Sequence, residues 1–167
     1  MTRRAIVLAL AGALALVTAL GPAVARAEGA AEACAPERVD IRGPWGTARF
    51  SVEIADDDAE RQRGLMFRDH LAAAHGMLFI YPRPGGYRFW MKNTLIPLDM
   101  IFIRPDGVVQ AVRHEARPGD ETPVGGGEGV LAVLEIRGGL ARAIGIGPGD
   151  AVRHPAFGPG AAWPCGN

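Results

Sequence analysis

Residues 98–114 read LDMIFIRPDGVVQAVRH, a nearly continuous apolar segment followed by a turn and a second extended segment. The turn sequence is Pro105-Asp106-Gly107, which separates segment 98–104 from segment 108–114. Two extended segments around such a tight turn predict a β-hairpin. Residues 130–136 (VLAVLEI) are equally apolar and predict another core strand.

The rest of the pattern extends this β-rich interpretation toward both ends. Ala48, Phe50, Val52 and Ile54 alternate with polar residues, which predicts a half-buried strand after the turn at 43–46. Asp57 and Glu60 have capping-box spacing and predict a short helix that ends at Gly64; a second short helix is predicted over 138–146. Many short strands, two or three short helices and no regular βαβ alternation predict a mainly β, α+β domain. We expect a compact curled sheet or a partly open barrel, because curling removes exposed sheet edges.

The first 27 residues predict export. A basic start, Met1 to Arg4, precedes an uncharged apolar segment at 5–20 and then the small-residue site Ala25-Arg26-Ala27. The apolar segment is short for a membrane span, which needs about 20 residues, although an uncleaved anchor is the alternative. We therefore predict a signal peptide at 1–27 and a periplasmic or secreted protein with no membrane attachment after cleavage.

The predicted mature chain has a linker at 28–37, a domain at 38–155 and a C-terminal tail at 156–167. Cleavage removes three basic residues and no acid from a chain with 18 of each, which leaves a net charge of about −3. A mildly acidic domain without a basic cluster argues against nucleic acid as a partner. Cys34 and Cys165 are predicted to form a disulfide that tethers the tail, with free thiols or a metal pair as alternatives.

Polar residues stand out in and beside the apolar segments. Lys92 is the only lysine among the 18 basic Lys and Arg residues, and it follows Trp90 closely. Asp99 shares a strand face with Ile101 and Ile103, and Glu135 is equally misplaced among apolar neighbours. Acids on such faces are rarely buried without a partner, so each is a candidate for a site or for a structural contact.

Other chemistries have little support. Met66, Met77, Met91 and Met100, together with His70 and His75, could bind a soft metal. However, Met66, Met77 and Met100 lie in apolar segments, where methionine fills core gaps. No nucleophile elbow, phosphate loop or dinucleotide-binding glycine pattern is present. We therefore predict no metal and no cofactor, and the sequence assigns no catalytic residue.

The polar positions belong to a set of motifs that closely resembles the DUF192 family, also called UPF0127. The motifs are RGLMFR at 63–68, GMLF at 76–79, WMKNT at 90–94, PLDM at 97–100 and VLE at 133–135. The resemblance covers roughly residues 38–155 and implies a β-rich, exported bacterial domain of unassigned biochemical role. It marks these candidate binding residues: Arg68, Trp90, Lys92, Asn93, Thr94, Asp99 and Glu135.

The leading hypothesis is a non-enzymatic exported domain that binds a small ligand, a glycan or an envelope partner in a groove near Trp90. The aromatic face would supply contact area, and Lys92, Asn93 and Asp99 would orient polar groups. One alternative is a hydrolase that uses Asp99 and Glu135 as an acid/base pair, which requires both carboxyl groups in one open cleft. Another is a purely structural polar cluster that holds loops to strands.

Overall fold

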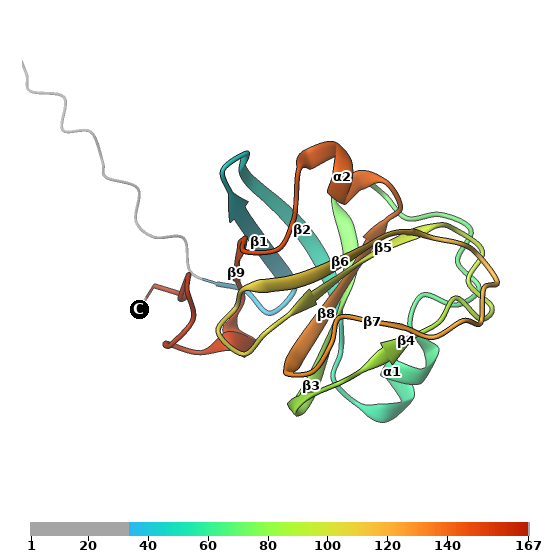
Figure 1. The fold of residues 1–167 in the computed structure, drawn as a ribbon, viewed down its shortest axis with the longest axis horizontal. Coiled ribbons are helices and arrows are strands. Elements are labelled where there is room, and N and C mark those ends of the chain that lie inside the picture. Colours follow the sequence, from blue (N-terminus) through green and yellow to red (C-terminus); the bar gives the residue numbers. More distant parts are fainter. Residues whose placement is uncertain (1–33, 167) are drawn as a thin grey trace, which may run out of the picture. The chain divides into compact units, whose positions relative to one another are not determined.

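The computed structural model of the protein describes residues 34–166 (Figure 1). The predicted signal peptide at 1–27 and the first part of the predicted linker lie outside the described residues. Within the described part, no helix is long and apolar enough to cross a membrane.

Short strands dominate the described chain, as the sequence predicts. The strands are β1 (Arg38–Gly43), β2 (Gly46–Ala55), β3 (His75–Gly85), β4 (Arg88–Phe89), β5 (Leu98–Ile103), β6 (Val109–Ala116), β7 (Val124–Gly125), β8 (Val130–Arg137) and β9 (Ala151–Arg153). The helices are α1 (Asp58–Arg63), α2 (Leu140–Ile144) and the 3-10 turn η1 (Pro155–Phe157). This composition confirms the mainly β, α+β fold class.

Seven strands of the described chain form one curled sheet in the order β6-β5-β8-β3-β2-β1-β9 (Figure 1). The two outer strands approach each other at one end. There Val109 N–H donates to Asp150 C=O at 2.9 Å, and Val152 N–H donates to Gly107 C=O at 2.7 Å. The sheet is therefore a partly open barrel, because these few backbone bonds join its edges only locally.

The two faces of the sheet carry separate apolar cores. The inner face packs alternate residues of β1, β2, β3, β5 and β8, among them Ile41, Phe50, Leu78, Ile101 and Leu134. The outer face of the middle strands carries a second core, which includes Met77, Phe79, Met100, Phe102 and Val133. Because side chains alternate along a strand, the register between strands decides which core each polar residue enters.

Local sequence signals explain most element boundaries. Asp57 caps α1 by accepting from Glu60 N–H at 2.8 Å, and Gly64 ends the helix with a φ of 48°. Strand β3 continues through Pro82 and Pro84 to Gly85. Its register to β8 shifts between Ile80 and Gly85. The reason is that Pro82 and Pro84 cannot donate to a ladder, so this part of the strand stays extended while regular pairing is interrupted.

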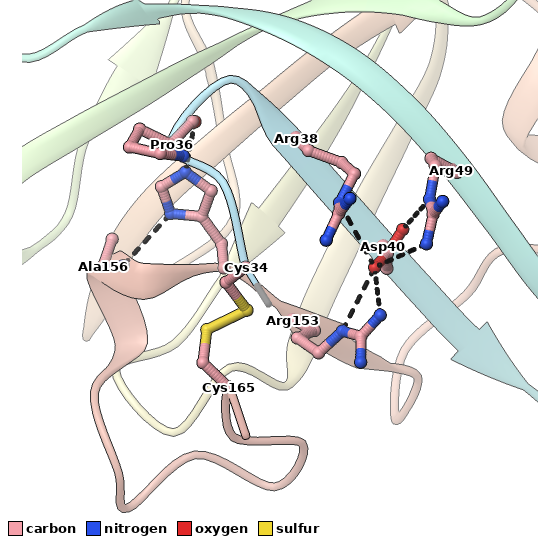
Figure 2. Close-up of a disulfide and its surroundings, with 9 residues drawn as sticks. Cys34, Pro36, Arg38, Asp40, Arg49, Arg153, Ala156 and Cys165 are labelled. Carbon is pink, nitrogen blue, oxygen red and sulfur yellow. Dashed lines mark hydrogen bonds and ion pairs between the residues drawn. A yellow bond between two sulfur atoms is a disulfide. The ribbon is translucent and has the colours of Figure 1, made fainter. Parts of the chain in front are cut away.

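The predicted disulfide joins Cys34 to Cys165, with 5.6 Å between the two Cα atoms (Figure 2). It attaches the C-terminal tail beside the start of β1. A formed disulfide is typical of an oxidising compartment, which agrees with the predicted export. The chain-entropy argument assigns such a long closed loop a stabilisation of about 4 kcal/mol.

Polar contacts reinforce this junction of the two ends (Figure 2). Asp40 is buried on β1 and bonds Arg49 at 2.7 Å and Arg153 at 2.5 Å. Burial alone would raise the pKa of Asp40, but the hydrogen bonds from these two guanidinium groups outweigh it and lower that pKa. His154 accepts Ala156 N–H at Nδ1, so its Nε2–H donates to Pro36 C=O at 2.7 Å. These groups are therefore structural.

Candidate functional site

A pocket of about 520 Å³ opens on the outer face of the sheet. Helix α1 and the segment after it form one wall, β4 and the 90–94 turn form another, and β3 and β8 form the floor. The charged and aromatic lining residues are Asp58, Arg61, Arg63, Phe79, Tyr81, Arg88, Phe89, Trp90, Lys92 and Glu135. The volume lies within the range of small-molecule sites, roughly 300–1,000 Å³.

Arg61 fixes the α1 wall against the floor. Its Nη1 donates to Ile80 C=O at 2.8 Å, and its Nη2 pairs with Asp58 at 2.6 Å. The guanidinium also lies 5.4 Å from the centre of the Tyr81 ring. Because α1 has only six residues and no buried side chain, these contacts hold the wall in place where packing does not.

The 90–94 turn is tied to the segment after α1. Phe67 N–H donates to Asn93 C=O at 2.8 Å, and Asn93 Nδ2 lies 3.8 Å from the sulfur of Met66. Asn93 has a φ of 53° and Phe67 a φ of 64°, in the left-handed region that few non-glycine residues adopt. Thr94 is buried and donates its hydroxyl to Lys92 C=O at 3.3 Å. Asn93 and Thr94 therefore shape the rim of the pocket.

Glu135 occupies the floor of the pocket. Its side chain comes from β8, opposite Met77 on β3 and Met100 on β5, and the residue is only 4% exposed. Within residues 34–166 its carboxyl group has no hydrogen bond and no ion pair. Burial raises the pKa of Glu135 to about 8. The group is therefore largely protonated at neutral pH and can both donate and accept a hydrogen bond.

Tyr81 lines the same pocket as Glu135, from a position further along β3. Its ring stacks on Tyr87 with 3.4 Å between the ring centres and 11° between the planes. Burial raises the pKa of Tyr81 to about 12, so its hydroxyl stays protonated. The floor therefore presents neutral, protonated oxygen groups rather than charges.

The rim, in contrast, is cationic. Arg63 and Arg88 are exposed at the pocket, and within the described chain neither forms a side-chain hydrogen bond or an ion pair. Lys92 Nζ lies 5.2 Å from the centre of the Trp90 ring, and Trp90 itself is 48% exposed. Since Asp58 already pairs with Arg61, the remaining rim charge is positive.

Asp99 does not belong to this pocket, which corrects the acid/base hypothesis. On β5 it lies opposite Ile136, whereas Glu135 lies opposite Met100, so the two carboxyl groups are on opposite faces of the sheet. Asp99 is fully buried. Its carboxylate accepts from the backbone N–H groups of Glu115 (2.7 Å), Gly139 (3.0 Å) and Ala141 (2.7 Å).

These bonds attach α2 and the end of β6 to β5, so the role of Asp99 is structural. The predicted acid/base pair with Glu135 is wrong, because one sheet layer separates its two members. Asp99 also cannot orient a ligand in the groove near Trp90, which the leading hypothesis asked of it.

Arg68 is also absent from the pocket lining. Its two terminal nitrogens each bond an oxygen of Glu53 at 2.6 Å, in an exposed bidentate pair on the neighbouring strand. The structure thus brings together Trp90, Lys92, Asn93, Thr94 and Glu135, and it leaves out Arg68 and Asp99.

Sequence reasoning missed most of the other lining residues, among them Arg61, Arg63, Tyr81 and Arg88. One available signal was that Tyr81 continues the alternation of Met77 and Phe79, which places it on the same face. The three arginines lie in a short helix and an edge strand, where single exposed cations are common, so no local pattern distinguished them. In residues 34–166 no group of three His, Cys, Asp or Glu side chains is arranged to hold a metal ion.

The fold and pocket define a single mainly β domain, a half-barrel with a cationic pocket on its outer face. The family profile of DUF192, described as an uncharacterized ACR, matches residues 40–154, so the chain belongs to the DUF192 family. This confirms the resemblance seen in the sequence motifs. No protein with a curated description matches the chain.

Two solved structures are similar to this one. A protein of unknown function from Novosphingobium aromaticivorans has 46% sequence identity and a TM-score of 0.68, over 69% of this chain and 82% of that one. A Sinorhizobium meliloti protein called a "putative transcription regulator" has 39% identity and a TM-score of 0.68, over 72% of this chain and 94% of that one. At these identities the likeness supports a common fold and family.

Proposed function

We propose that the domain is a non-enzymatic binding module of the periplasm or the extracellular space, and that it holds a small ligand in the pocket beside Trp90. A glycan end or a segment of an envelope protein would enter the same pocket. The Cys34–Cys165 disulfide supports an oxidising location.

The observation that carries this proposal is the Glu135 carboxyl group. A purely structural acid is expected to bond backbone N–H groups or a cation, as Asp99 and Asp40 do. Glu135 is 4% exposed, lines the pocket and has no such partner in the described chain. The carboxyl oxygens are open to the pocket, because in the described chain the only buried side-chain polar atom without a partner is Nδ1 of His114. A bound ligand can therefore take the place of water at Glu135 and exchange hydrogen bonds with it.

The aromatic lining supports binding rather than catalysis. Trp90 and Phe89 give apolar contact area next to polar groups, a combination typical of small-molecule sites. With Asp99 on the other face, the hydrolase alternative lacks its second carboxyl group in this pocket.

The test is a thermal-shift screen of small molecules on the purified, disulfide-bonded protein. A ligand of the native state raises the melting temperature. We expect compounds that stabilise the wild type and Leu95→Ala but not Trp90→Ala. Leu95 is the matched control because it is 57% exposed, like Trp90 a large exposed apolar residue, yet it does not line the pocket. Binding that survives Trp90→Ala unchanged would contradict the proposal.

A further inference from the structure

The distribution of charge in the pocket indicates what kind of ligand it takes. Four cations line the pocket, and Asp58 neutralises only Arg61. Arg63 and Arg88 have no acidic partner in the described chain, and Lys92 contacts the face of Trp90 rather than a carboxylate. Outside the pocket, Arg68 pairs with Glu53, whereas the exposed Arg83 and Arg137 form no ion pair in residues 34–166. The distinctive feature of the pocket is therefore that several such cations gather at one site.

Glu135 does not neutralise these cations. It forms no ion pair with any of them, and burial is the cause that raises its pKa. The cations therefore lie at the rim, and the carboxyl group lies below them in a separate, uncharged part of the pocket. A ligand that matches both parts has an anionic group at one end and a hydroxyl group at the other.

The walls add a third requirement. Trp90 and Phe89 also line the pocket. Aromatic faces pack well against flat, weakly polar surfaces. The C–H face of a sugar ring has this character, and its edge carries hydroxyl groups that pair with a protonated carboxyl.

We propose that the ligand is an acidic sugar, a sugar ring with a carboxylate or phosphate group. The anionic group contacts Arg63, Arg88 and Lys92, and a ring hydroxyl bonds Glu135. This inference rests on the proposed function, because it assigns the ligand class of the same pocket.

Matched sugar pairs test the inference by calorimetry on the disulfide-bonded protein. Glucose is compared with glucuronate, which carries a carboxylate group, and with glucose 6-phosphate, which carries a phosphate group. Each pair therefore differs in one group. Inorganic phosphate alone is the probe without a ring. Hydrogen bonds between charged groups are stronger than those between neutral groups, so we expect at least one acidic sugar to bind about tenfold or more tightly than glucose. The carboxylate and phosphate arms distinguish the two anionic groups.

Variants connect the affinity to the rim. Arg63→Gln, Arg88→Gln and Lys92→Gln are expected to weaken the acidic sugar several-fold each, whereas the affinity for glucose stays the same. Arg137→Gln is the control, because Arg137 is exposed and lies outside the pocket. A thermal melt of each variant verifies that it folds. Replacing these exposed side chains is not expected to change the melting temperature.

The other possible results distinguish a failure of the acidic-sugar proposal from a failure of the proposed binding function. If glucose binds as tightly as glucuronate and only Trp90→Ala weakens it, the anionic class is wrong and the proposed pocket function stands. If phosphate binds as tightly as glucose 6-phosphate, the sugar ring is wrong. If no sugar or phosphate binds while the general screen finds another ligand, the acidic-sugar class is wrong. If the screen also finds none, both proposals fail.

Discussion

Replacing Glu135 by glutamine is expected to stabilise the protein at neutral pH. Burial raises the pKa of the folded-state carboxyl to about 8, whereas its ordinary value is 4.5. Between these two values the unfolded chain releases the proton and the folded chain keeps it. The folded state therefore binds more protons, and the wild-type free energy of unfolding falls as pH rises from about 4.5 to about 8.

The size of the effect follows from the same two values. Each pH unit in this window lowers the free energy of unfolding by at most about 1.4 kcal/mol, so at pH 7 retaining the proton costs about 3 kcal/mol. Glutamine has nearly the same shape and is neutral at every pH. We expect Glu135→Gln to be about 2–3 kcal/mol more stable than the wild type at pH 7 and equal to it near pH 4. For a domain of this size that corresponds to a rise in melting temperature of roughly 5–12 °C.

The assay is urea unfolding of both proteins at intervals from pH 4 to pH 9 with the disulfide intact. Other titrating groups are common to both proteins and cancel in the difference. Glu121→Gln, which changes an exposed loop glutamate, is the control and should follow the wild-type profile. Parallel wild-type and Glu135→Gln profiles would refute the reasoning, because they would mean that Glu135 titrates alike in the folded and unfolded chain.

The remaining predictions concern structural groups. Asp99→Asn should lose about 2–4 kcal/mol of stability in urea unfolding, because the amide presents N–H groups to backbone donors, and ligand affinity should not change. Unchanged stability would contradict the structural role. Reduction of Cys34–Cys165 should lower the unfolding free energy by up to about 4 kcal/mol, and an identical melting temperature with and without reductant would contradict this. Burial lowers the pKa of His154 below its ordinary value, so the stability that its neutral form gives at neutral pH is lost as pH falls through the folded-state value. His154→Gln should flatten this acid limb, and a limb as steep as that of the wild type would exclude His154 as its cause.

Strand positions and short helices could be predicted from local patterns. Period-two alternation marked β2, the turn sequence at 105–107 marked the β5–β6 hairpin, and capping-box spacing marked α1. These signals depend on residues within a few positions of one another, so the sequence carries them directly.

The pairing register between neighbouring strands decides which side chains reach the pocket. The sequence of one strand alone does not determine that register. Asp99 and Glu135 are equally conspicuous in the sequence, yet the pairing of Asp99 with Ile136 sends them to opposite faces of the sheet. A shift of one residue would have brought both acids to one face. The sequence does not give the pairing of β5 with β8, so it could not predict that the two acids lie on opposite faces.

The charged residues at the rim of the pocket come from separate segments of the chain. Arg63 ends α1, Arg88 begins β4 and Lys92 follows β4, so segments about 25 residues apart in the chain supply one cluster of charge. Of the motif at 90–94, Trp90, Lys92, Asn93 and Thr94 line this pocket. The motif residue Arg68 instead bonds Glu53 outside the pocket, because it lies beyond the turn at Phe67.

The most direct test of the account is a ¹³C NMR titration of the Glu135 side-chain carboxyl, assigned by comparison with Glu135→Gln, with and without glucuronate. We expect a midpoint near pH 8 in the protein alone and a resonance that moves when the sugar is added. A midpoint near the ordinary glutamate value, with a resonance that no acidic sugar disturbs, would contradict it.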